Sequence, residues 1–344
     1  MKVDVGDTSG GLIEPGAPDS VLTHSGHDRE EALSPQVGVI VLHWGSVEMT
    51  SRCLQSLALV SSPASKTVFL IDNAQSFNQV LAESAAPLEV KVFRPPRNLG
   101  FAGGCSIGIT LAMQHGVDFI LLLNNDAVVE PSFLDHLLKA ARGSSNAGIL
   151  CPQILFDEDP NKVWYGGGAF SFRSGIPLQA RGRQRIMTDS SPCEVDWASG
   201  CAMLIDPAVI RAVGSFDPAF FAYCEDVDLS LRVRAAGFKI VFVPASIVRH
   251  AATGERLRLS QGIYYSTRNL LEVMRRHAAW YHWLSFTANF LARWVGFFCA
   301  LAIVRRRPEF VAALVEGTLD FARGNLGERG VSHPAELPSN GPEP

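Results

Sequence analysis

Four short apolar runs near the start of the chain each end in polar residues, and this pattern limits the fold more than any other feature. The runs are Val37–Leu42, Thr67–Ile71, Leu88–Phe93 and Asp118–Leu123. The first, Val37–Leu42, is rich in β-branched residues and continuously apolar, which is typical of a strand covered on both faces, and we expect strands at the other three runs as well. Stretches with helical patterning, such as Met49–Leu59, lie between them. We therefore expect a mostly parallel, doubly wound α/β sheet with helices on both faces.

The polar residues that follow these runs are candidates for a ligand site. Asp72 and Asn73 follow the second run, Arg97–Gly104 follows the third, and Asn124–Asp126 follows the fourth. In open α/β sheets, ligands bind beyond the carboxyl ends of the strands. The sequence thus predicts a site at this edge of the sheet.

The pattern is less regular in the second half of the chain. The segment Leu150–Val195 is rich in Gly and Arg without helical periodicity, and we expect a loop or a small excursion of short strands there. A helix is predicted to begin near Glu225 and to stop before Gly237, a typical helix-ending residue. Phe238–Val243 is predicted to be another buried strand, and the turn PASIV then leads to a histidine.

Composition excludes several classes of protein. The 344 residues are 47% hydrophobic and 19% charged, which suits one large domain with appendages. The formal net charge of −4 argues against a nucleic-acid binder, which would normally carry a strongly basic domain. The seven cysteines are scattered without a C-x-x-C pair, so neither a disulfide framework nor a zinc ribbon is indicated. A reducing cytoplasm is the expected compartment.

The two ends of the chain differ from its body. Residues 1–35 are expected to be a disordered leader, without the pattern of a secretory signal, and residues 331–344 a disordered tail.

A long apolar stretch, Ala278–Val304, is followed at once by Arg305–Arg307. It is long enough to span a bilayer, but His282 and Arg293 interrupt it. A helix lying in the membrane interface, a packed internal helix and a true span all stay open, and the spread of aromatic residues favours the first. Residues 273–330 are therefore predicted to attach the chain peripherally to the anionic inner face of a bacterial cell membrane.

Three segments carry side chains suited to chemistry, each with a plainer alternative. Asp126 projects from a strand end, where it would suit a metal, although Asn and Asp also favour simple turns. Three carboxylates lie close together at a predicted helix start, at Glu225, Asp226 and Asp228. The helix dipole favours acidic residues at this position in any case. The aromatic run FFAY before them would raise a carboxyl pKa toward that of a general base. His250, taken alone, is better explained by a structural role than by a ligand role.

The segment that begins at Arg97 offers a cradle for phosphate oxygens. Arg97, Gly100, Gly103 and Gly104 would supply a guanidinium and accessible backbone amides. The spacing is neither G-x-G-x-x-G nor G-x-x-x-x-G-K-[ST], so NAD enzymes and P-loop ATPases lose support.

Taken together, seven segments in this order resemble the motif series of family 2 glycosyltransferases, in particular the bacterial rhamnosyltransferase-like branch. They cover Val37–Leu271 and read VGVIVLHWGS, FLIDNAQ, RNLGFAGGCSIGI, FILLLNNDAVVEP, DWASGCAMLI, GSFDPAFFAYCEDVDLSLRVRAAGFKIVFVPASIVRH and YYSTRNL. The resemblance implies a GT-A fold over residues 36–272, a nucleotide-diphosphate sugar donor, a divalent metal (Mg²⁺ or Mn²⁺) and inversion at the anomeric carbon.

The same resemblance implies roles by position. Asp226, next to Glu225, matches the general base, while Asp126 matches the last Asp of the D-x-D metal motif and His250 a further metal ligand. Asn124 stands where that motif has its first Asp, which removes one anionic ligand. The predicted donor-binding residues are His43, Trp44, Asp72, Arg97, Gly100, Gly103, Gly104, Asn124, Asn125, Trp197 and Gly200.

The predicted function is transfer of a sugar, by resemblance rhamnose, from a dTDP- or UDP-sugar to a hydroxyl of a cell-envelope or lipid-linked glycan. The alternative is a catalytically inactive sugar-binding or scaffold protein at the membrane, which Asn124 keeps open and Asp226 disfavours. A nucleotidyltransferase is disfavoured because no basic N-terminal triphosphate signature is present. No nucleic-acid partner is expected, and a homo-oligomer stays open.

Overall fold

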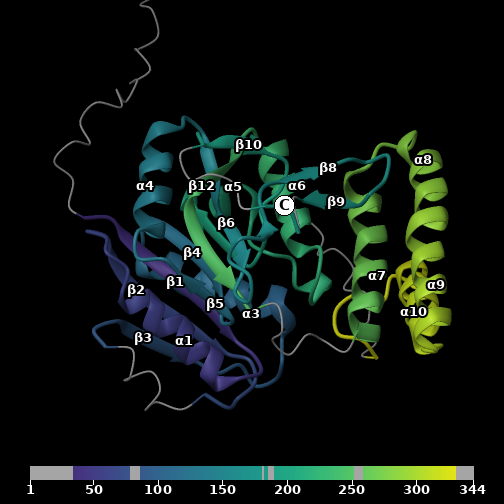
Figure 1. Cartoon of the computed structure of the whole chain (residues 1–344), viewed down its shortest axis with the longest axis horizontal. Helices are drawn as coiled ribbons and strands as arrows, with labels where there is room; N and C mark the ends of the chain where they lie inside the picture. The colour runs from purple at the N-terminus through teal and green to yellow at the C-terminus, as the bar shows by residue number, and fades with distance from the viewer. Residues whose placement is uncertain (1–33, 78–85, 180–181, 185–189, 252–258, 331–344) are drawn as a thin grey trace, which may run out of the picture. The chain divides into compact units, whose positions relative to one another are not determined.

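The computed structural model of the protein describes residues 34–77, 86–179, 182–184, 190–251 and 259–330 (Figure 1). Its centre is a ten-stranded sheet. The main order of strands is β10 (Cys193–Val195), β12 (Lys239–His250), β6 (Ala147–Phe156), β11 (Ala202–Ile205), β4 (Phe119–Asn124), β1 (Gln36–His43), β2 (Ser65–Asp72) and β3 (Glu89–Phe93). The short strands β5 (Ala127–Val129) and β7 (Val163–Tyr165) pair with β12 and β6.

The sheet is mixed but mostly parallel, and this confirms the expected class. β1 runs parallel to β2 and β4, β2 to β3, and β6 to β12. β11 lies antiparallel between β4 and β6, so it joins two parallel groups. The four runs predicted as strands are β1 to β4, with ends that differ by a few residues.

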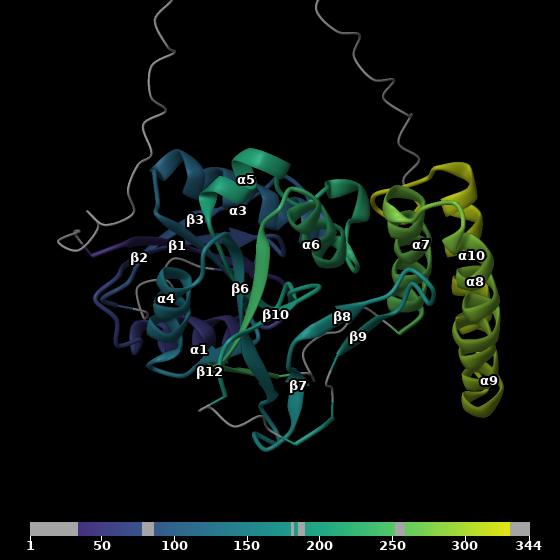
Figure 2. The ribbon, with the colours of Figure 1, turned by 90° about the horizontal axis from the view of Figure 1, so that it is seen from above.

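Helices cover both faces of the sheet (Figure 2). α1 (Val47–Ala58) and α4 (Phe133–Gly143) lie on one face, and α3 (Gly100–His115), α5 (Pro207–Val213) and α6 (Glu225–Ala235) lie on the other. α3 approaches β1 closely because it carries glycines at the contact. A Cβ atom on Gly108 would lie 2.3 Å from Ile40 Cγ2.

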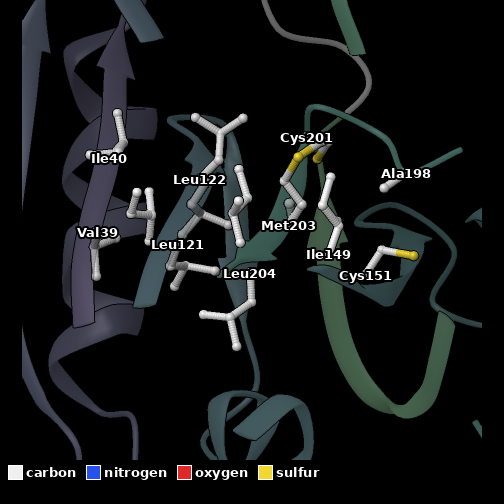
Figure 3. Packing of buried hydrophobic residues seen from close by; sticks show 14 of the residues in the cluster. Val39, Ile40, Leu121, Leu122, Ile149, Cys151, Ala198, Cys201, Met203 and Leu204 are labelled. Atoms are coloured by element: carbon white, nitrogen blue, oxygen red, sulfur yellow. The ribbon is translucent and has the colours of Figure 1, made fainter. Parts of the chain in front are cut away.

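The apolar core lies between the strands and these helices. Figure 3 shows Val39 and Ile40 of β1 beside Leu121 and Leu122 of β4, with β11 and β6 continuing the layer through Leu204 and Ile149. All of these side chains are buried, which accounts for the unbroken apolar runs in the sequence.

In the second half, strands β6 and β11 were not predicted, and β12 was predicted too short. Most of β6 lies within the stretch expected to be a loop or an excursion of short strands, because Pro152 and Gln153 interrupt its apolar pattern. Gln153 is nevertheless buried, and its Nε2 donates to the carbonyl of Pro244 at 3.2 Å. The expected turn PASIV is wrong, since β12 continues to His250 through an irregularity between Val243 and Ile247 that accommodates a proline. The short strands expected within this stretch are β7, β8 (Gly168–Phe170), β9 (Pro177–Gln179) and β10.

The C-terminal part is helical. α7 (Leu259–His277) packs against α10 (Glu309–Arg323). In the sequence between these two helices, α8 (His282–Asn289), the π-helical segment η2 (Phe290–Val295) and α9 (Gly296–Arg305) follow one another without a break. The expected boundary at residue 272 falls within α7. The expected disordered ends lie almost entirely outside the described residues.

The run His282–Arg305 is a single helix long and apolar enough to cross a membrane, and only 11% of its most hydrophobic window is buried. Trp280, Leu284 and Ile303 are 85%, 85% and 79% exposed. A packed internal helix, one of the three alternatives, is therefore contradicted within the part of the chain that the structure describes.

Candidate active site

A cavity of about 670 Å³ opens at the carboxyl ends of β1 and β4. Nine of the residues predicted for the site line it: Trp44, Gly100, Asn124, Asn125, Asp126, Gly200, Glu225, Asp226 and His250. They come from six separate stretches of sequence, so only the fold brings them together.

Asp126 and His250 face each other across two strands. Asp126 directly precedes β5, and β5 pairs antiparallel with the end of β12, with Ala127 opposite His250. The Asp126 Oδ1 atom lies 3.0 Å from His250 Nε2. Neither Asp126 Oδ1 nor His250 Nδ1 has a hydrogen-bond partner among the described residues, so the short approach is a contact without hydrogen-bond alignment.

This pair fits a divalent cation. Asp126 Oδ1 is buried without a hydrogen-bond partner among the described residues and lies 3.0 Å from His250 Nε2, a separation that two ligands of one ion can have. Oxygen and imidazole ligands suit Mg²⁺ or Mn²⁺. No group of three or more His, Cys, Asp or Glu with metal-site geometry occurs among the described residues, so the remaining ligands would come from the donor diphosphate and water.

Asn124 and Asn125 fix the strand end beside this pair. Asn124 donates its backbone N–H to the carbonyl of Cys201 at 2.8 Å, which ties β4 to β11. The Asn125 amide donates to the carbonyl of Trp44 at 3.1 Å and to Thr50 Oγ1 at 2.8 Å. Asn125 therefore places the loop that carries Trp44 on the cavity wall.

Glu225 and Asp226 begin α6 and also line the cavity. Asp226 Oδ2 accepts from the Gly200 N–H at 3.0 Å, and Oδ1 accepts from the Val227 N–H at 2.8 Å. Burial raises the pKa of Asp226, although these two N–H groups act to lower it. Burial raises the pKa of Glu225 well above its usual value, and the charge on Asp226 raises it further. Both oxygens of Asp226 thus accept hydrogen bonds, whereas Glu225 Oε2 is buried without a partner among the described residues.

Two predicted donor-binding residues, His43 and Asp72, are buried away from the cavity. The His43 ring bonds Thr50 Oγ1 at 2.7 Å and Ser76 Oγ at 2.9 Å, and burial lowers its pKa. Asp72 accepts from the backbone N–H groups of Ser76 and Phe77, both at 3.1 Å, and from Arg94 Nε at 3.0 Å. Both side chains hold the loop after β2 in this structure, and their role in donor binding stays a prediction.

The expected phosphate cradle is also used internally. The N–H groups of Leu99, Gly100 and Ala102 donate to Asn73 Oδ1, Asn98 Oδ1 and the Phe221 carbonyl, at 2.9, 2.8 and 3.1 Å. Gly103 and Gly104 lie inside α3, and a Cβ on Gly104 would lie 2.4 Å from Leu42 Cδ1. Arg97 is exposed and does not line the cavity. Gly103 and Gly104 thus serve helix packing in this structure, whereas Gly100 lines the cavity, and phosphate binding by this segment stays a prediction.

Trp197 supports the site from behind. Its indole Nε1 donates to the Leu178 carbonyl at 3.4 Å, and its carbonyl accepts from the Tyr165 hydroxyl at 2.6 Å. It is buried and lies outside the cavity lining, so it shapes the wall that carries Gly200 without facing the cavity.

One wall of the cavity contains none of the predicted site residues. Leu259, Gly262, Ile263 and Ser266 of α7 line it, together with Phe298 of α9. The spacing of Gly262 and Ser266, four residues apart on one helix face, was an available signal. The C-terminal helices are therefore part of the site.

Comparisons with known proteins agree with this architecture. The sequence pattern described as "Glycosyltransferase like family 2" matches residues 35–282. The N-acetylglucosaminyl-diphospho-decaprenol L-rhamnosyltransferase of Mycobacterium tuberculosis H37Rv is 29% identical over 67% of this chain and 81% of its own length. The rhamnosyltransferase WbbL of Escherichia coli K12 is 32% identical over 39% of this chain and 53% of its own.

Two solved structures share the fold. Staphylococcus aureus TarS (1–349) superposes with a TM-score of 0.54 at 15% identity, over 83% of this chain and 80% of that one. GalNAc-T7, solved with UDP, GalNAc and Mn²⁺, superposes with a TM-score of 0.55 at 21% identity, over 72% of this chain and 48% of that one. The likeness confirms the GT-A-type fold, and the match over most of its length shows that this chain belongs to the family 2 glycosyltransferases.

Proposed function

We propose that this glycosyltransferase is metal-dependent and inverting, and that it transfers rhamnose from a dTDP- or UDP-linked donor to a hydroxyl of a lipid-linked cell-envelope glycan. The observation that carries the proposal is that Asp226 and the pair Asp126–His250 lie on the wall of one cavity. The choice of rhamnose is supported by the names of both rhamnosyltransferase relatives, and the choice of a lipid-linked acceptor by the name of the Mycobacterium tuberculosis relative.

Asp226 is the group suited to activate the acceptor. An acceptor hydroxyl attacks the anomeric carbon as the bond from that carbon to the diphosphate oxygen breaks, and Asp226 takes the hydroxyl proton. The raised pKa of Asp226 brings the carboxylate closer to the basicity that this transfer needs. One displacement with one base inverts the anomeric configuration and needs no second nucleophilic carboxylate.

Asp126 and His250 would hold the cation. When bound, a divalent cation supplies positive charge that stabilises the departing diphosphate. Asn124 takes no anionic part here, and its backbone role in tying β4 to β11 is independent of its side chain.

The test is a transfer assay on the purified chain. Release of nucleoside diphosphate from dTDP-rhamnose and UDP-sugars is measured with Mn²⁺, with Mg²⁺ and with chelator, and the anomeric configuration of the product is read by NMR. Asp126→Ala and His250→Ala should each weaken metal-dependent donor binding, whereas Asp135→Ala, an exposed carboxylate on α4, should not. Persistent absence of turnover with all donors would favour the inactive scaffold.

The exposed helix 282–305 supports peripheral membrane attachment. The side chains of Leu284 and Ile303 are 85% and 79% exposed, and the exposed residues Arg305–Arg307 lie at the end of the helix. Basic residues beside an apolar helix attract anionic headgroups at about 1 kcal/mol each. Trp294 Nε1 donates to Thr267 Oγ1 of α7 at 3.0 Å, and Phe298 lines the cavity. A spanning helix would have to leave these contacts, so they favour a helix lying in the interface at the cytoplasmic face.

Vesicle sedimentation tests this attachment. Leu284→Glu with Ile303→Glu should release the protein from anionic vesicles, and charge reversal of Arg305–Arg307 should weaken binding in a salt-dependent way. Leu59→Glu is the matched control, because Leu59 is an apolar residue 74% exposed at the end of α1. Equal sedimentation of all variants, or none by the wild type, would rule the attachment out.

A further inference from the structure

The segment immediately before the proposed base has an unusual backbone. Phe221, Tyr223 and Cys224 all have positive φ angles, of 61°, 69° and 66°. Bulky residues seldom adopt this region, and such conformations persist only where the surroundings enforce them. Glu225 and Asp226 follow at once and begin α6, so the direction in which α6 starts depends on this segment.

One side chain, Asn269 of α7, holds the segment. Asn269 is fully buried, and its Nδ2 lies 2.8 Å from the carbonyls of Phe220 and Ala222 and 2.7 Å from the carbonyl of Tyr223. An amide has two N–H donors, so the three carbonyls share them. These carbonyls converge on one point only because the backbone between them is turned into the left-handed region.

The orientation of the Asn269 amide is itself fixed. The buried Arg268 donates from Nε to Asn269 Oδ1 at 2.9 Å, which directs Nδ2 toward the carbonyls. Arg268 Nη2 also donates to the Phe220 carbonyl at 3.0 Å, and Nη1 donates to the Gly327 carbonyl at 2.7 Å. On the other side, the Phe221 carbonyl accepts from the Ala102 N–H of α3 at 3.1 Å. The segment is therefore held between α3 and α7.

We propose that Asn269 is a positioning residue for the transfer reaction: by gathering the carbonyls of Phe220, Ala222 and Tyr223 it holds the strained segment that aims Asp226 into the cavity. The proposal rests on Asp226 acting as the base. Asn269 lies one to two turns from Ile263 and Ser266, which line the same cavity. One helix thus forms a wall of the cavity and sets the direction of the base on the neighbouring wall.

The experiment separates positioning from simple stabilisation. In Asn269→Ala, kcat should fall by about 10- to 100-fold, the range expected when a reacting group is displaced by about 1 Å. Affinity for nucleoside diphosphate with Mn²⁺, measured by calorimetry, should stay within about twofold because the Asp126–His250 wall is untouched. Asn269→Ser keeps one donor and should give an intermediate kcat. Asn289→Ala is the matched control, since Asn289 of α8 also donates to backbone carbonyls but lies outside the cavity lining.

A double-mutant cycle gives the decisive readout. If Asn269 acts through Asp226, adding Asn269→Ala to Asp226→Asn should cause little further loss of kcat. An additive loss, an unchanged kcat in Asn269→Ala, or a parallel fall of kcat and nucleotide affinity would overturn the proposal. Should Asn269→Ala fail to fold, the same cycle with Asn269→Ser decides. A fully active Asp226→Asn would instead refute the proposed function itself, so the two failures are distinguishable.

Discussion

Replacing Asp226 with Asn tests the proposed chemistry most directly. The amide cannot take the acceptor proton, and loss of a general base typically costs about 10² to 10⁴ in rate. The substitution should also change the free energy of unfolding, because both carboxylate oxygens accept hydrogen bonds from backbone N–H groups, from Gly200 at 3.0 Å and from Val227 at 2.8 Å. The amide NH₂ must face one of these donors, which costs about 1–3 kcal/mol, and removal of a buried charge offsets part of this cost.

The same substitution has a defined pH dependence. Since burial raises the pKa of Asp226, wild-type turnover should fall as the pH falls through that raised pKa, and this acid limb should be absent from the residual activity of Asp226→Asn. The free energy of unfolding should change with pH in the opposite direction to turnover. The folded state favours the protonated carboxyl, so the wild type should lose stability relative to the variant as the pH rises through the raised pKa.

The assay is nucleoside diphosphate release together with product formation, with donor affinity and thermal unfolding measured on the same samples. Asp159→Asn serves as the control, because Asp159 is a surface carboxylate paired with Lys162. Donor affinity of Asp226→Asn should match that of the wild type. Turnover above about a tenth of wild type would refute the assignment of Asp226 as the base, because a loss of less than about tenfold is smaller than the loss expected when a general base is removed.

Three further outcomes are expected. Gly108→Ala should lower the free energy of unfolding by about 1–3 kcal/mol in denaturant titration, because its Cβ would lie 2.3 Å from Ile40 Cγ2; an unchanged midpoint would contradict the close packing of α3. Asp228→Asn should lower the free energy of unfolding by about 3–5 kcal/mol, since this buried carboxylate pairs with Arg232 at 2.9 Å and His277 at 2.8 Å. Although burial acts to raise the pKa of Asp228, these partners hold it below its usual value, so the stability that the carboxylate contributes should be lost as the pH falls through that lowered pKa. Chelation should weaken donor binding in calorimetry, and equal affinity with and without Mn²⁺ would argue against the Asp126–His250 site.

Local sequence determined the first half of the sheet and the positions of several site residues. An unbroken apolar run by itself indicates that both faces of a strand are covered. The strands β1, β2 and β4 could therefore be predicted without knowing which strands they pair with. Asp126 at a strand end and Asp226 at a helix start followed from the same local signals, and both line the cavity.

Only the tertiary structure decided which partner each polar group takes. His43 and Asp72 sit at strand ends like Asn124, yet the loop after β2 folds back over them and satisfies their side chains. Strand β6 stayed hidden because its interruption, Gln153, is satisfied by a carbonyl from β12 that is distant in sequence. The approach of Asp126 to His250 likewise depends on the pairing of β5 with β12.

The same holds for the C-terminal helices. Their composition predicted an apolar extension, but not which of its residues would stay uncovered. It also did not predict that α7 would line the cavity through Ile263 and bond the segment before Asp226 through Asn269. Apolar periodicity is a property of neighbouring residues, whereas burial and hydrogen-bond partners depend on which elements pack together. That packing is a property of the whole chain, and for this reason the strands were readable from the sequence and the partners of the polar side chains were not.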